Sequence, residues 1–101
     1  MLTMASADSL ASKLIGATIK TPTNETIGDV SDLVVDESGE IKAVIAGVGG
    51  LLGIGEQNVM LNFHQLHFNR DGNDRLVAVS PMSRDHVKAL PAWHEPTAMH
   101  Q

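Results

Sequence analysis

The sequence predicts an all-β fold: a small six-stranded β-barrel with a short C-terminal helix. Short apolar stretches rich in β-branched residues recur along the chain, and several alternate with polar residues at the period of a half-buried strand. Turns rich in glycine, asparagine and aspartate separate these stretches, and one short stretch near the C-terminus has a helical pattern. At 101 residues, the chain is long enough for one domain with an ordinary core.

The first strand is predicted over residues 14–21. Its alternation places Ile15, Ala17 and Ile19 on one face, which we expect to be buried. Residues 22–25, with the sequence PTNE, are typical of a turn because proline pre-sets the first corner and asparagine tolerates a left-handed backbone.

The second strand is predicted over residues 27–36, and its alternation slips. Ile27 and Val30 are three positions apart, so a regular pleat cannot place both in the core. We therefore expect a β-bulge near Gly28 that bends the strand. Residues 36–40 then form a hairpin turn rich in acidic residues and glycine.

The third strand, residues 41–48, is apolar on both faces except for Lys42. A strand of this kind needs cover from a helix, a second sheet or a second subunit. It is the best indication of self-association in the sequence, and it makes Val44 and Val48 candidate interaction residues.

A glycine-rich loop follows over residues 49–58. The loop does not have the glycine spacing of a dinucleotide-binding loop, because Leu52 stands where the third glycine is needed. In addition, no helix is predicted to follow it. Leu51, Leu52 and Ile54 are apolar at the tip and would form an interaction patch if exposed. The alternative is that they fold back over the end of the barrel.

Three further strands and a helix complete the predicted fold. The strands are expected over residues 58–63, 66–70 and 75–79, with a corner between the first two and a hairpin turn at 71–74. The helix is expected over residues 83–90, capped by Ser83. The domain is predicted to span residues 13–93, between disordered segments 1–12 and 94–101.

Composition excludes several classes of function. A net charge of −5 without a basic cluster argues against nucleic-acid binding, and no apolar run approaches the roughly 20 residues of a membrane span. Cysteine is absent, so neither a disulfide nor a cysteine zinc site can form. No secretory signal is visible at the N-terminus, and we expect a cytoplasmic protein.

No residue pattern specifies a reaction, a cofactor or a metal site. Ser83 and His86 are three positions apart at a helix start, which helix capping explains without catalysis. For a small-molecule or divalent-cation sensor, the alternative function, the candidate ligands are Asp32, Asp36 and His67. We predict no catalytic residue.

Several stretches resemble, in order, the PRC-barrel domain family. They are SKLIG at 12–16, the IGDVSDLVVD stretch at 27–36, the AVIAGVGGLLGIGE hairpin at 43–56 and SRDHVKALPAW at 83–93. The similarity covers roughly residues 10–93 and implies a six-stranded barrel that serves binding and assembly without catalysis. The family includes short stand-alone bacterial proteins, which this sequence resembles, a reaction-centre subunit domain and a ribosome-maturation factor domain.

The specific roles of those two larger relatives are not expected here. Unlike in the reaction-centre subunit, no membrane helix is predicted before the barrel, and the N-terminal domain of the ribosome factor is not recognised in the sequence. The sequence therefore predicts a non-catalytic module that forms a homodimer and docks onto an unknown protein partner. The predicted interaction residues are Val44, Val48, Leu51, Leu52 and Ile54.

Overall fold

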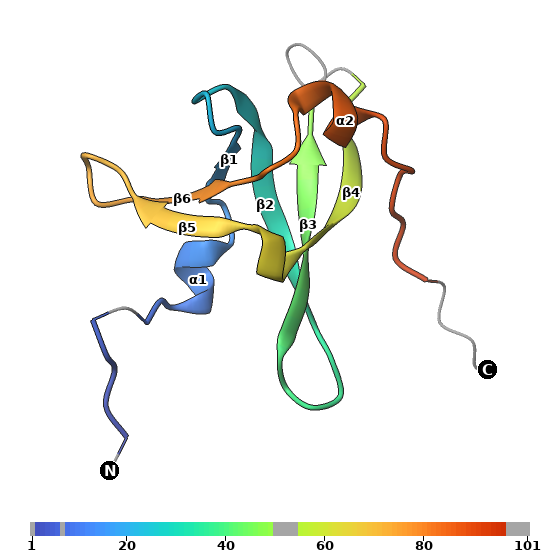
Figure 1. Cartoon of the computed structure of the whole chain (residues 1–101). Coiled ribbons are helices and arrows are strands. Elements are labelled where there is room, and N and C mark those ends of the chain that lie inside the picture. The colour runs from blue at the N-terminus through green and yellow to red at the C-terminus, as the bar shows by residue number, and fades with distance from the viewer. Residues whose placement is uncertain (1, 7, 50–54, 97–101) are drawn as a thin grey trace, which may run out of the picture.

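The structure, a computed structural model, describes residues 2–6, 8–49 and 55–96. This part of the chain is mostly β, with two short α-helices and a 3-10 turn (Figure 1). Neither helix is long and apolar enough to cross a membrane. In chain order, the elements are α1 (Ala11–Leu14), β1 (Thr18–Lys20), β2 (Thr26–Val35), β3 (Ile41–Val48), β4 (Gln57–Asn62), η2 (Phe63–Gln65), β5 (His67–Arg70), β6 (Leu76–Val79) and α2 (Arg84–Lys88).

The six strands form one sheet in the order β4-β3-β2-β1-β6-β5. Only β1 and β6 pair in parallel; the other neighbours are antiparallel. The predicted six-stranded sheet is confirmed, but the closure into a barrel is not, because β4 and β5 are its outer strands and no ladder joins them in the described residues. The 3-10 turn η2 separates these two strands, and β5 then runs crosswise to β4 (Figure 1).

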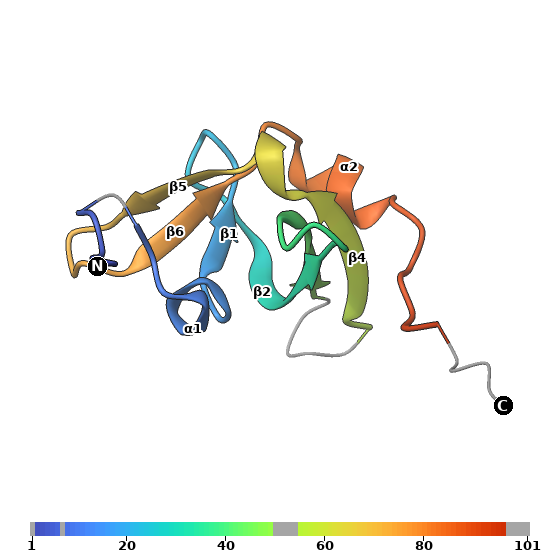
Figure 2. The same cartoon turned by 90° about the horizontal axis from the view of Figure 1, so that it is seen from below.

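The core lies where the two parts of the bent sheet face each other. β2, β3 and β4 form one part, and β5 and β6 run crosswise to them, with α2 beside β4 (Figures 1 and 2). Side chains from both parts meet in one cluster, which α2 joins through Val87. Among its fully buried members are Ile19, Val30, Val44, Val59, Ala78 and Val87.

The predicted first strand, residues 14–21, is too long. Leu14 ends a helical turn, and Gly16 follows with φ of +94°, a backbone conformation that glycine adopts without a steric cost. The Gly16 N–H donates to the Val30 carbonyl over 2.7 Å, which fixes this turn against β2. The turn points Leu14 into the core and leaves Ile15 42% exposed, contrary to the alternation. The other two residues predicted to be buried here, Ala17 and Ile19, are buried.

The bulge predicted near Gly28 is confirmed. Ile19 pairs with Gly28, and the next residue, Lys20, pairs with Thr26, so Ile27 is the extra residue on β2. The backbones of β2 and β3 approach closely here, and a Cβ atom on Gly28 would overlap the carbonyl oxygen of Gly47. Glycine is therefore needed at position 28 for two reasons: the backbone of β3 leaves no room for a Cβ atom, and the strand bends here.

Three turns of the sheet have the same five-residue construction. In each turn, the backbone N–H of the first residue donates to the carbonyl of the fifth residue over 2.8 Å. The N–H of the fourth residue donates to the carbonyl of the first. The fourth residue has positive φ in all three: 71° at Asn24, 91° at Gly39 and 61° at Asp74. Residue types that tolerate a left-handed backbone thus occupy the positions that require it, and the sequence indicated this for Asn24 and Gly39. The turns are residues 21–25, 36–40 and 71–75.

The predicted C-terminal helix is confirmed but is shorter than expected, at residues 84–88. Ser83 caps it as predicted, since its Oγ accepts from the His86 N–H over 3.1 Å. Beyond the helix, the Trp93 N–H donates to the Asn58 carbonyl over 2.7 Å. The chain after α2 therefore partly covers the free edge of β4, which lowers the risk of uncontrolled strand pairing there.

Candidate functional site

The third strand has the predicted bounds, Ile41–Val48, and its cover comes from the same chain. Val44 and Val48 are 0% and 3% exposed and belong to the core cluster. On the opposite face Ile45 is 3% exposed, between its cross-strand partners Asp32 and Met60. A second subunit is therefore not needed to bury this strand, and Val44 and Val48 offer no surface in a single chain.

The other three predicted interaction residues, Leu51, Leu52 and Ile54, lie outside the described residues. Their role at the tip of the β3–β4 hairpin stays a prediction from the sequence.

The candidate ligands of the sensor hypothesis are not brought together. Asp32 and Asp36 lie on or just after β2, whereas His67 opens β5, and β1 and β6 lie between these strands in the sheet. Asp32 accepts locally from the Leu33 N–H over 2.8 Å. In the described part of the chain, no group of three or more His, Cys, Asp or Glu residues could hold a metal ion.

The carboxylates of Asp36 and Asp71 are held by the turns that they begin. Asp36 Oδ1 accepts from the Ser38 hydroxyl over 2.6 Å and from two backbone N–H groups. Asp71 Oδ1 accepts from the backbone N–H groups of Arg75, over 3.0 Å, and Asn73, over 2.8 Å. These bonds lower the pKa of both carboxyl groups, chiefly through the Ser38 hydroxyl at Asp36 and the Arg75 N–H at Asp71.

The lowered pKa values predict a loss of stability in acid. A carboxyl group with a lower pKa in the folded chain stabilises the fold above its unfolded pKa, near 4, and this contribution is lost as the pH falls through the folded value. We expect the melting temperature of the wild type to fall as the pH drops below about 4. In the double variant Asp36→Asn/Asp71→Asn, the same drop in pH should lower the melting temperature by less. Glu37→Gln, a neighbour without such bonds, is the control. An equal acid dependence in the double variant and the wild type would contradict this role.

Ser83 and His86 form a helix cap and not a nucleophile–base pair. The Ser83 oxygen accepts from the backbone N–H of His86, so the bond that joins these residues does not involve the imidazole. This agrees with the capping role expected from the sequence.

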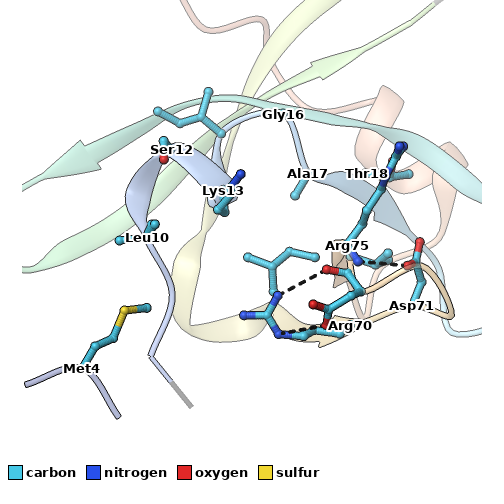
Figure 3. A pocket seen from close by; sticks show the side chains of 14 residues that line it. Met4, Leu10, Ser12, Lys13, Gly16, Ala17, Thr18, Arg70, Asp71 and Arg75 are labelled. Atoms are coloured by element: carbon cyan, nitrogen blue, oxygen red, sulfur yellow. Dashed lines mark hydrogen bonds and ion pairs between the residues drawn. The ribbon is translucent and has the colours of Figure 1, made fainter. Parts of the chain in front are cut away.

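One groove of about 600 Å3 lies where the N-terminal segment and α1 face the β5–β6 hairpin (Figure 3). We call it the α1 groove. Met4, Leu10 and Ile15 provide apolar surface from the N-terminal side, and Leu76 and Val77 of β6 provide it from the sheet. The sequence did not reveal this groove because residues 1–12 were expected to be disordered. The available signal was the recurrence of large apolar residues within that otherwise small and polar segment.

The α1 groove also gathers positive charge. Three of the seven Lys and Arg residues line it: Lys13, Arg70 and Arg75. Arg70 pairs with Asp74, with Nε 3.8 Å from Oδ1, and Nη1 donates to the Asp74 carbonyl over 3.4 Å. Lys13 and Arg75 make no ion pair with any described residue. The groove is therefore amphipathic, and its three cations outnumber its two carboxylates, Asp71 and Asp74.

Comparison with known proteins agrees with this architecture. The family model of the PRC-barrel domain matches residues 8–83, which is most of the chain. No curated protein matches the chain. The six-stranded sheet with its bent β2, the buried β3 and the match over residues 8–83 lead to one conclusion: the chain belongs to the PRC-barrel domain family.

Proposed function

We propose that this chain is a non-catalytic assembly module that self-associates and docks onto a partner protein. The observation that carries the proposal is the PRC-barrel match over residues 8–83, because domains of this family generally mediate protein interactions. Fold alone does not specify function, so the proposal also needs a surface suited to a protein partner.

The distribution of exposed apolar side chains supports such a surface. Four of the six large apolar residues exposed in the described part of the chain lie within its first fifteen residues. Single exposed apolar residues are ordinary, but several at one end of a small domain favour an interaction site. These four, with their exposed fractions, are Leu2 (99%), Met4 (57%), Leu10 (53%) and Ile15 (42%).

Self-association is tested most directly by sedimentation equilibrium of the full chain. We expect a dimer at high micromolar concentration, with dissociation on dilution. A single species with the mass of one chain throughout that range would contradict the proposal. A docked partner that binds only the folded chain should in addition raise its melting temperature.

The tip of the β3–β4 hairpin gives a separate prediction. If Leu52 contacts the second copy, Leu52→Asp should raise the dissociation constant of the dimer at least about tenfold, because a charge would replace an apolar contact. The circular dichroism spectrum and melting temperature should stay close to those of the wild type. Ala92→Asp, at an exposed position after α2 and away from the α1 groove, is the matched control for replacing an apolar residue by a negative charge. An unchanged dimer would remove the tip from the contact surface.

A further inference from the structure

Charge is distributed unevenly over this acidic chain. The α1 groove holds Lys13, Arg70 and Arg75, with Asp74 already paired to Arg70 and Asp71 bonded within its own turn. By contrast, the β2–β3 hairpin, residues 26–48, carries five acidic residues and a single cation, Lys42. Its acidic residues are Asp29, Asp32, Asp36, Glu37 and Glu40.

The turn of this hairpin presents both apolar and acidic groups. We call residues 35–40 the acidic turn. Val35 is 58% exposed, and the carboxylates of Glu37 and Glu40 make no ion pair with any described residue. The turn extends away from the body of the molecule (Figure 1), and its bonds to Asp36 hold its backbone in one conformation. A pre-ordered segment loses less conformational entropy on binding.

We infer that the acidic turn of one copy occupies the α1 groove of a second copy. Val35 then meets the apolar wall of Met4, Leu10 and Ile15, and Glu37 and Glu40 meet the cations of the groove. The inference rests on the self-association proposed above and names the surfaces that carry it. It requires only groups seen in the described residues, and it gives an ionic partner to Lys13 and Arg75.

The positions of the α1 groove and the acidic turn allow each copy of a dimer to insert its acidic turn into the groove of the other. α1 and the acidic turn lie toward the same end of the molecule in Figure 1, and both come forward when the molecule is seen from that end in Figure 2. A twofold axis at this end would bring each turn to the groove of the other copy. The result is a closed dimer with two identical contacts, which agrees with the expected homodimer.

A second copy fits the groove better than an anionic membrane surface does. The net charge of −5 opposes approach to anionic lipid, since the groove is a small positive region on an acidic molecule. A narrow acidic turn can reach the cations while the rest of the surface stays apart. The apolar residue next to the carboxylates also matches the amphipathic lining.

Charge reversal on each side tests the inference. Lys13→Glu/Arg75→Glu makes the groove acidic, and Glu37→Lys/Glu40→Lys makes the turn basic. All four side chains are exposed, so both variants should keep the fold, which circular dichroism checks. In each variant alone, like charges face each other in both contacts, and we expect the dissociation constant of the dimer to rise at least about tenfold.

Mixing the two variants is the decisive step. In a one-to-one mixture, each contact of the heterodimer again joins opposite charges, so sedimentation should show a dimer with nearly wild-type affinity. The wild-type dimer should weaken as salt is raised, because exposed charge pairs are screened. Lys88→Glu combined with Glu95→Lys, at exposed positions away from the groove, is the control and should leave the dimer unchanged.

The outcomes separate the two proposals. A wild-type dimer that neither reversal weakens, or that mixing fails to restore, overturns the inference but leaves self-association standing. A wild-type monomer at high micromolar concentration overturns both. Binding of the monomer to phosphatidylglycerol vesicles that Lys13→Glu/Arg75→Glu abolishes would assign the groove to a membrane, and the inference would again be wrong.

Discussion

Gly28→Ala is expected to destabilise the domain by at least about 3 kcal/mol, a large part of the 5–15 kcal/mol typical of small proteins. The added Cβ would overlap the carbonyl oxygen of Gly47 and lie 3.3 Å from the Val48 Cα. Both neighbours are backbone atoms of β3, so no side-chain rotation can relieve the overlap. β2 and β3 must separate, and their ladder is the most extensive one in the sheet.

Urea unfolding followed by circular dichroism measures this effect. Gly72→Ala is the matched control, because no atom lies within 4 Å of its added Cβ and its φ is not positive. The control should change the free energy of unfolding by less than about 0.5 kcal/mol. If Gly28→Ala were as stable as the control, the close approach of β2 and β3 would not exist in solution.

The bulge at Gly28 also illustrates what the sequence could predict. The slip between Ile27 and Val30 is a local signal, because the period of a strand is two residues and any departure from it is visible in the pattern. The turns were also predicted from local signals, because asparagine at position 24 and glycine at position 39 tolerate the positive φ that they adopt. The third turn was predicted from its composition, but the positive φ of Asp74 was not. The limits of β3 were predicted to the residue for the same reason.

Features that depend on distant segments were missed. Leu14 and Ile15 are both apolar, and the turn at Gly16, which is bonded to Val30 of the distant strand β2, places Leu14 and not Ile15 in the core. Two-sided burial of β3 was visible, but whether its cover came from the same chain or another copy was not. The α1 groove brings together residues near positions 4–18 and 70–77, and no local pattern connects them.

Val44→Asp is expected to abolish cooperative folding, with a cost of at least about 4 kcal/mol, because it places an unpaired carboxylate in the core. Val44 is fully buried within one chain and pairs across the sheet with Leu33 and Leu61. None of these neighbours can pair with a charge. The measurements are the circular dichroism spectrum at 25 °C and a thermal scan, in which the native transition should be lost.

This substitution separates the two roles that Val44 could have. The residue was first a candidate for an interface between subunits, and an interface residue changed to aspartate would give a folded monomer. A core residue gives an unfolded chain at every concentration. Met60→Asp, on the neighbouring strand and 43% exposed, is the control and should stay folded at a cost of about 1 kcal/mol. A folded, monomeric Val44→Asp variant would show that a second copy covers Val44 in the wild-type dimer. The dimer contact would then lie at β3 and not at the α1 groove and the acidic turn.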